Sequence, residues 1–213
     1  MIPRLRFSDR REAGRALAPR VLEFTNPPSV VLGVPRGGVE VAEPIAKLLG
    51  AQLAPVWVKK LYAPDLPDVA LGAVDLDGDV TLSPDLARAE GLTDELIAEI
   101  AFHGHEILLR EWEQGPGLDA SALLPGATAI IVDDCITTGL TLRAAMRWAR
   151  RQFVRKVVLA VPVVDTRMWH HVAGDADRAI TLEEREDGPL ARSDIYEHYH
   201  RVSADAMATL LGS

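Results

Sequence analysis

Two adjacent carboxylates, Asp133 and Asp134, directly follow an apolar run, Ala129–Val132. Beyond them lies a short loop, and then an amphipathic run from Leu140 to Phe153 with the spacing of a helix. This order predicts a buried strand, an acidic pair at its carboxyl end, and the N-terminus of a helix. Phosphorylated ligands bind at such an edge of an α/β sheet, because the unpaired N–H groups and the positive dipole end of a helix attract anions.

The loop between the predicted strand and helix is rich in hydrogen-bond donors. The hydroxyls of Thr137, Thr138 and Thr141 can donate to a phosphate, and Gly139 lets the backbone approach it closely. The two preceding carboxylates can accept hydrogen bonds from sugar hydroxyls, or hold Mg²⁺ directly or through water. A phosphate at one end and hydroxyls at the other describe ribose 5-phosphate. The alternative is that the aspartates only cap a helix and face solvent.

A second glycine turn, Pro35-Arg36-Gly37-Gly38, lies between an apolar run, 30–34, and a helical pattern, 39–49. Backbone N–H groups of a Gly-Gly turn can surround an anion, and the Arg36 guanidinium can fork onto phosphate oxygens. We expect a strained or cis peptide near Arg36-Gly37. Taken alone, the same residues also fit an ordinary turn.

Lys59 and Lys60 follow a third apolar run, 53–58. Side chains at the carboxyl ends of parallel strands point toward the crevice where α/β sheets bind ligands. The alternative interpretation is two solvated surface lysines. The prolines and aspartates of residues 62–68 then predict a mobile loop.

The whole pattern predicts a doubly wound, mainly parallel α/β sheet flanked by helices, in a single domain over 1–213. Residues 62–115 are expected to form a small hood, with a loop, a hairpin around Asp77-Gly78 and a long helix, 93–113. The other predicted helices are 8–24 (capped by Ser8), 39–49 (ended by Gly50), 140–153, 166–172 and 204–211, and the other strands are 156–164 and 178–182. Residues 115–126 are expected to be a linker.

The composition fits a globular protein. Of 213 residues, 48% are hydrophobic and 25% are charged, and the net charge of -8 gives no overall attraction to nucleic acid. The single cysteine, Cys135, excludes an internal disulfide and favours a reducing cytoplasm. We recognise neither a signal peptide nor a membrane-spanning run. We therefore expect a cytoplasmic protein without nucleic-acid or membrane partners.

The acidic motif, VDDCITTGLT from Val132 to Thr141, resembles the phosphoribosyl-pyrophosphate (PRPP) signature of type I phosphoribosyltransferases. The turn at Arg36 resembles the pyrophosphate loop of the same family. Nearly the whole chain is similar to a bacterial group of phosphoribosyltransferases. The acceptor of that group is unassigned. The resemblance implies that the following residues bind PRPP: Arg36, Gly37, Gly38, Lys59, Lys60, Asp133, Asp134, Cys135, Ile136, Thr137, Thr138, Gly139 and Thr141.

The resemblance also implies roles. Asp133, Asp134, Arg36 and Lys59 would be catalytic, Asp133 and Asp134 would hold Mg²⁺, and the chain would form a homodimer. The bacterial group commonly has Gly at the position of Cys135 and Arg at that of Lys59. Because Lys lacks the bidentate fork of Arg, its grip on phosphate would be looser. We expect the Cys135 thiol to be buried and inert.

The acceptor is not identified by these patterns. Thr137 stands where 6-oxopurine transferases carry an acidic residue, and a threonine is no general base at pH 7, so hypoxanthine and guanine are disfavoured. Tyr196, His198 and Tyr199 either line the hood that receives the acceptor or pack against the core. The histidine pairs 103/105, 170/171 and 198/200 have poor spacing for a metal site.

Two further functions are weighed against the transferase. The first is a regulatory module that binds PRPP or a nucleotide without chemistry; the retained pyrophosphate loop and lysines favour catalysis over it. The second is a hydrolase acting through Asp133, which would lack an acid partner two residues on, where Cys135 stands.

Overall fold

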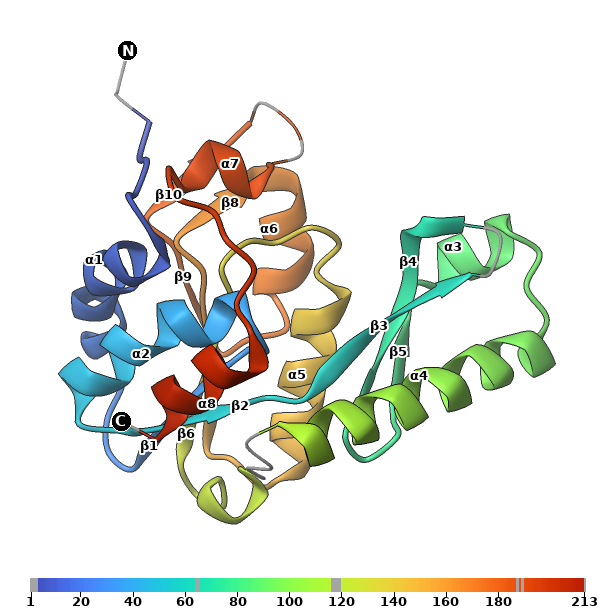
Figure 1. Ribbon diagram of the computed structural model, residues 1–213, viewed down its shortest axis with the longest axis horizontal. Coiled ribbons are helices and arrows are strands. Elements are labelled where there is room, and N and C mark those ends of the chain that lie inside the picture. The colour runs from blue at the N-terminus through green and yellow to red at the C-terminus, as the bar shows by residue number, and fades with distance from the viewer. Residues whose placement is uncertain (1–3, 64–65, 116–119, 187, 189, 213) are drawn as a thin grey trace.

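The computed structural model describes residues 4–63, 66–115, 120–186, 188 and 190–212. At its centre is a five-stranded sheet in which every strand is parallel to its neighbours (Figure 1). In spatial order its strands are β2 (Gln52–Pro55), β1 (Ser29–Gly33), β6 (Thr128–Val132), β7 (Lys156–Ala160) and β9 (Arg178–Ile180). This arrangement confirms the predicted doubly wound, mainly parallel sheet.

Helices cover both faces of this sheet. They are α1 (Arg10–Leu22), α2 (Gly37–Leu49), α5 (Leu140–Arg151) and α6 (Thr166–Ala173). Ile130 packs in the cluster that contains α1 and α2, and the next residue, Ile131, packs in the cluster that contains α5 and α6. Successive side chains of a strand point to opposite faces, so a strand covered on both faces must be apolar throughout. This is why β1, β6 and β7 were recognisable as continuous apolar runs.

Gly14 lets the backbones of α1 and α2 pack closely, because a Cβ there would lie 2.3 Å from the carbonyl oxygen of Val41. We expect Gly14→Ala to lower the free energy of unfolding by about 2 kcal/mol, since overpacking against backbone outweighs the gain of about 1 kcal/mol in helix propensity. Urea unfolding measures this change. The matched control is Gly174→Ala, where a Cβ meets nothing within 4 Å. Equal stability of the two variants would contradict the close packing.

A hood extends from the sheet body (Figure 1). Its antiparallel sheet consists of β3 (Val58–Ala63), β4 (Leu66–Asp75) and β5 (Val80–Leu82), and its helices are α3 (Pro84–Ala89) and α4 (Asp94–Gln114). The predicted hairpin is present, with Gly78 at φ 87° in its turn. The predicted long helix is also present, and the Thr93 side chain caps it by accepting a hydrogen bond from Leu96 N.

An ion-pair cluster attaches the hood to the body. Arg151, at the end of α5, contacts the carboxylates of Asp75, Asp77 and Asp79 at 2.6, 3.3 and 3.0 Å. Asp75 is 1% exposed, so its pairing with Arg151 offsets the cost of burying its charge. The β4–β5 turn is therefore held to the helix that begins at the acidic motif.

The strand predicted from the apolar run 53–58 is wrong in extent. The central strand β2 ends at Pro55, and after Val56 and Trp57 the chain enters β3 of the hood. The lysine pair therefore lies on a hood strand and not at the tip of a central one. The predicted loop, 62–68, is also wrong in large part, because β3 runs to Ala63 and β4 begins at Leu66. Residues 64 and 65 of that prediction lie outside the described residues.

The predicted strand 156–164 is two strands. β7 ends at Ala160, and β8 (Val163–Asp165) pairs instead with β10 (Glu183–Arg185). Pro162 separates them because it has no N–H for a sheet hydrogen bond. The predicted cap of α1 is wrong by one residue, since Asp9 accepts the hydrogen bond from Glu12 N.

The remaining elements are short. They are η1 (Ser121–Leu123), α7 (Arg192–Ile195) and α8 (Ala204–Leu211). α8 was predicted, whereas η1 lies in the expected linker, 115–126, of which 116–119 fall outside the described residues. β10, α3 and α7 were not predicted. The described part of the chain contains no helix that is both long and apolar enough to cross a membrane.

Candidate active site

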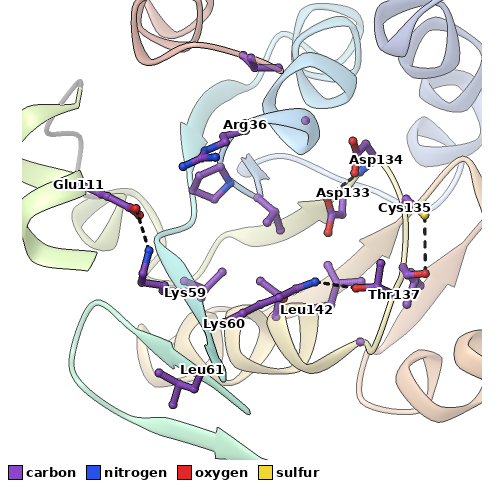
Figure 2. Close-up of a pocket in the computed structure, with 18 of the residues that line it drawn as sticks. Arg36, Lys59, Lys60, Leu61, Glu111, Asp133, Asp134, Cys135, Thr137 and Leu142 are labelled. Carbon is purple, nitrogen blue, oxygen red and sulfur yellow. Dashed lines mark hydrogen bonds and ion pairs between the residues drawn. The ribbon is translucent and has the colours of Figure 1, made fainter. Parts of the chain in front are cut away.

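A cavity of about 770 Å³ opens between the carboxyl edge of the central sheet and the hood. All of the predicted PRPP-binding residues line it except Gly38 and Thr138. Figure 2 shows that Arg36, Lys60, Asp133 and Thr137 reach this space from different elements. They come from the β1–α2 turn, from β3 and from the β6–α5 loop. The fold thus brings together three motifs that are far apart in the sequence.

The β6–α5 loop ends at Gly139, the N-cap of α5, with φ 73°. A Cβ at this residue would lie 2.2 Å from Val172 Cγ2, so glycine is required by the close approach of α6 as well as by the positive φ. Thr141 lines the cavity from the first turn of α5, and Thr137 is exposed at its edge. Hydroxyls and a helix N-terminus therefore face one region, as binding of a phosphate requires.

The β1–α2 turn is strained. Arg36 has φ 79° and ψ -102°, a conformation that is rare for a residue with a side chain. We predicted a strained or cis peptide near Arg36-Gly37, and the strain is confirmed. The cis half is wrong, because the cis peptide bond of the described residues is Pro27–Pro28. Arg36 is the N-cap of α2 but makes no capping hydrogen bond through its side chain.

The two glycines after Arg36 allow this turn to rest on the tip of β6. A Cβ at Gly37 would lie 2.1 Å from Asp134 Oδ2, and one at Gly38 would lie 2.6 Å from the carbonyl oxygen of Val132. Gly38 therefore lies beneath the cavity rather than on its wall. The β1–α2 turn is thus held directly against the acidic pair.

The two carboxylates, expected to act together, have different surroundings. Asp133 points into the cavity (Figure 2), and its Oδ1 accepts a hydrogen bond from Asp134 N at 2.8 Å. Burial, with the neighbouring charge of Asp134, raises the pKa of Asp133 to about 8. Asp134 is 1% exposed and pairs with Arg10 Nε at 2.8 Å and Arg192 Nε at 3.0 Å. Asp133 therefore faces the cavity, while Asp134 links α1, α7 and the β6–α5 loop through its two arginines.

Neither lysine of the pair is a solvated surface residue. Lys59 Nζ lies 2.8 Å from Glu111 Oε1 on α4, and Lys60 Nζ donates to Thr137 Oγ1 at 2.7 Å (Figure 2). Burial lowers the pKa of Lys60, although the Asp133 carboxylate opposes the shift. Lys60 thus links the hood to the β6–α5 loop across the cavity.

This geometry agrees with the comparison with known families. The model of the phosphoribosyl transferase domain matches residues 10–188, which include the β1–α2 turn, the lysine pair and the acidic motif. The chain belongs to this family. The family that the sequence resemblance indicated is therefore confirmed.

Relatives support the same assignment. Proteins of Mycobacterium tuberculosis strains H37Rv and CDC 1551, each named "Putative phosphoribosyl transferase", are 39% identical over 176 residues, or 83% of this chain. The chain spans 40% of the length of these relatives. The crystal structure of TT1426 from Thermus thermophilus is 32% identical, with a TM-score of 0.82, and 97% of this chain and 98% of that one are covered.

A more distant structure shows the fold alone. A hypoxanthine phosphoribosyltransferase from Staphylococcus aureus is 13% identical, with a TM-score of 0.51, over 94% of this chain and 90% of that one. The phosphoribosyl transferase fold is thus shared at low identity, and the acceptor must be argued from the residues of this chain.

Three arginines that the sequence patterns missed also line the cavity: Arg10 on α1, and Arg192 and Arg201 in the C-terminal segment. Tyr199, which was a sequence candidate, lines it with them. No local motif marked these arginines; they are recognisable only once the chain is folded. The Tyr199 ring centroid lies 5.0 Å from Arg10 Cζ, in the geometry of a cation–π contact.

The other aromatic candidates have structural roles. Tyr196 is buried and its hydroxyl donates to the carbonyl oxygen of Asp134 at 2.8 Å, so the packing alternative is right for this residue. His198 does not line the cavity, and its Nδ1 lies 3.1 Å from the carbonyl oxygen of Ser8. Across the described residues, no group of three or more His, Cys, Asp or Glu side chains has the arrangement of a metal site.

Cys135 is buried, as expected, with 3% of its surface exposed. Burial, with Asp134 beside it, raises the pKa of the thiol to about 12. We expect iodoacetamide at about pH 8 to leave Cys135 unmodified in the native protein and to alkylate it rapidly in urea, because the thiolate is the reactive species. Intact-mass spectrometry follows the reaction. Rapid alkylation of the native protein would contradict an inert thiol.

Proposed function

We propose that this phosphoribosyl transferase uses PRPP and Mg²⁺ to transfer ribose 5-phosphate to a nitrogen atom of a small-molecule acceptor, with release of pyrophosphate. The observation that carries this proposal is that one cavity has two anion-binding turns with Asp133 between them. PRPP has a phosphate at one end, a pyrophosphate at the other, and ribose hydroxyls in between. The ligand and the cavity therefore match in charge and in order.

In this proposal the donor lies across the cavity. The 5-phosphate binds at the α5 N-terminus with Thr137, Thr138, Gly139 and Thr141, and Cys135 and Ile136 line the ribose. The pyrophosphate binds at the β1–α2 turn. There the Arg36 guanidinium donates a pair of hydrogen bonds to phosphate oxygens, and Gly37 and Gly38 leave space for the ligand to approach the backbone. Lys59 and Lys60 contribute positive charge from the hood. When the donor binds, the Lys59 ammonium group leaves the Glu111 carboxylate and contacts a phosphate oxygen instead.

Asp133 is the carboxylate that suits Mg²⁺. It faces the cavity, and no described residue donates a hydrogen bond to its Oδ2. Both oxygens of Asp134 contact arginine, which leaves Asp133 as the direct ligand. One carboxylate is sufficient, because Mg²⁺ in nucleotide-type sites is completed by substrate phosphates and water. When bound, Mg²⁺ supplies positive charge that stabilises the departing pyrophosphate.

The chemistry is a substitution at C1 of the ribose. The bond from C1 to the pyrophosphate oxygen breaks, the acceptor nitrogen forms a bond to C1, and the bonding pair leaves with pyrophosphate. Asp133 and the ribose-side dipoles stabilise the positive charge that develops on the sugar, and Arg36 stabilises the leaving group. Thr137 supplies no base, so we expect hypoxanthine and guanine to be poor acceptors.

Pyrophosphate release from PRPP, measured with Mg²⁺ across a panel of nitrogenous acceptors, tests the proposal. We expect turnover with at least one acceptor class, and its loss in the double variant Asp133→Asn with Asp134→Asn. Unchanged turnover in that variant would overturn the assignment. Binding of PRPP without turnover across the panel would favour the regulatory module instead.

The remaining expectations are part of the same proposal. We place the chain in the cytoplasm as part of a homodimer, with residues 1–213 forming one domain and without nucleic-acid partners. Light scattering coupled to size exclusion tests the dimer.

A further inference from the structure

One arginine of the cavity is held in place by the acidic motif. Arg192 lies on α7, and its side chain is 34% exposed. Its Nε contacts both carboxylate oxygens of Asp134, at 3.1 and 3.0 Å. None of the described residues accepts a hydrogen bond from its two terminal nitrogens. Arg192 therefore presents an unused pair of donors while its orientation is fixed.

The support behind Arg192 is buried. Asp134 is also bound by Arg10, whose second partner is Glu40 at 3.1 Å. On α7 itself, Ile195 is fully buried, and its carbonyl oxygen accepts a hydrogen bond from Phe7 N. A guanidinium on such a support loses little rotamer freedom when it binds a ligand, so a planar anion can be held as a bidentate pair.

The cavity has an excess of positive charge, although the chain as a whole has a net charge of -8. Among the described residues that line it, six are arginine or lysine and three are aspartate or glutamate. The six are Arg10, Arg36, Lys59, Lys60, Arg192 and Arg201. The proposed donor uses Arg36 and the two lysines, whereas Arg192 belongs to a segment outside all three donor-binding motifs.

Arg192 lies close to the proposed ribose site. It contacts Asp134, the neighbour of Asp133 in the sequence, and all three residues line the same cavity. In the proposed reaction, positive charge develops on the ribose beside Asp133. Asp134 is shared between two guanidiniums, those of Arg192 and Arg10, so positive charge remains in excess there and a further anion would lower the barrier.

We propose that the acceptor of this enzyme carries a carboxylate, which the terminal nitrogens of Arg192 bind. This inference rests on the proposed function and names the class of its second substrate. A carboxylate offsets the guanidinium near the developing charge and brings the nucleophilic nitrogen to C1 in a fixed orientation. A phosphate on the acceptor would add more negative charge to a site that already holds the phosphates of PRPP, so the carboxylate is the better match.

Matched pairs of probes test the charge requirement. Nicotinate with nicotinamide, orotate with uracil, and benzoate with benzamide each differ at a carboxylate. Calorimetry measures their binding to the protein saturated with Mg²⁺, ribose 5-phosphate and pyrophosphate. We expect at least one carboxylate to bind about tenfold or more tightly than its neutral partner, as for a charged hydrogen-bonded pair. If no carboxylate exceeds its neutral partner, the inference is overturned.

Variants assign the preference to Arg192. We expect Arg192→Gln to abolish the preference, Arg192→Lys to retain part of it, and PRPP affinity to stay within about twofold in both. The control is Arg147→Gln, at an exposed arginine on α5 away from the cavity, which should change nothing. A rise in the Kd of PRPP with an unchanged carboxylate preference would make Arg192 a donor-binding residue and would overturn the inference. If Arg192→Gln does not fold, the wild-type probe pairs and Arg192→Lys still decide.

The failure of this inference is distinguishable from failure of the proposed function. If PRPP does not bind the wild-type protein, the proposed function fails. If PRPP binds and neutral acceptors release pyrophosphate as well as carboxylates do, the function stands and the carboxylate requirement is wrong.

Discussion

Asp134→Asn is expected to lower the free energy of unfolding by about 3–5 kcal/mol, as removal of one member of a buried ion-pair network does. Arg10 is 4% exposed and would keep Glu40 as its remaining carboxylate partner. Arg192 would lose the carboxylate that orients it. Thermal and urea unfolding measure the loss. Because Asp134 supports both the β1–α2 turn and α7, we expect activity to fall as well, at temperatures where the variant is still folded.

Asp133→Asn should lower activity without lowering stability, whereas Asp134→Asn should lower both. We expect kcat/KM for PRPP to fall by about 100-fold or more, because this carboxylate would face the ribose and the metal in the proposed complex. Stability should be unchanged or higher, since burial disfavours the ionised form of Asp133 and asparagine carries no charge. Asparagine also retains an oxygen that can accept the hydrogen bond from Asp134 N.

The comparison of the two variants tests the separation of roles. Equal losses of stability in Asp133→Asn and Asp134→Asn would show that the two carboxylates form one unit. Full activity in Asp133→Asn would remove this residue from the proposed site, whatever the stability of the variant.

Arg36→Gly is a further variant with a large expected effect. We expect turnover to fall by about 100-fold, because the guanidinium that would stabilise the leaving pyrophosphate is lost. Stability should be kept or raised by about 1 kcal/mol, since glycine adopts the positive φ of this residue without strain. Steady-state kinetics with PRPP and urea unfolding measure the two effects. A gain in stability with a loss of activity would show that the strained backbone at Arg36 supports activity at the expense of stability.

Phe153→Gly is the matched control. Phe153 also has a positive φ, 58°, and is 82% exposed outside the cavity. Glycine there should relieve a similar strain and leave turnover unchanged. If both variants lose activity to the same degree, the effect of Arg36→Gly arises from the loss of stability or flexibility, and Arg36 has no specific role.

The lysine pair illustrates why part of the site could not be predicted in detail. Lys59 and Lys60 were recognised as candidates, and both line the cavity. Their place was wrong, because the apolar run before them continues across two strands of different sheets. Hydrophobicity does not mark that change of sheet, since the apolar run 53–58 continues without a polar residue from β2 into the start of β3. The decisive contact is the one from Lys60 to Thr137, 77 residues away.

By itself, the sequence determined the parallel sheet and marked the motifs to which we assign donor binding. β1, β6 and β7 are apolar throughout because both of their faces are covered, and glycines and threonines mark the turns where helices begin. These are local signals, made by residues within a few positions of each other. Local chemistry was therefore enough to recognise the family and a site for a ligand with phosphates at both ends.

Only the tertiary structure decided that Asp133 and Asp134 have different surroundings. Asp133 and Asp134 are identical neighbours in the sequence, yet one faces the cavity and the other is bound by Arg10 and Arg192, 124 and 58 residues away. No spacing rule links those three residues, because their contact depends on where α1 and α7 pack against the sheet. The physical reason is that burial and pairing of a charge are set by distant parts of the chain, and these determine which carboxylate can meet a substrate.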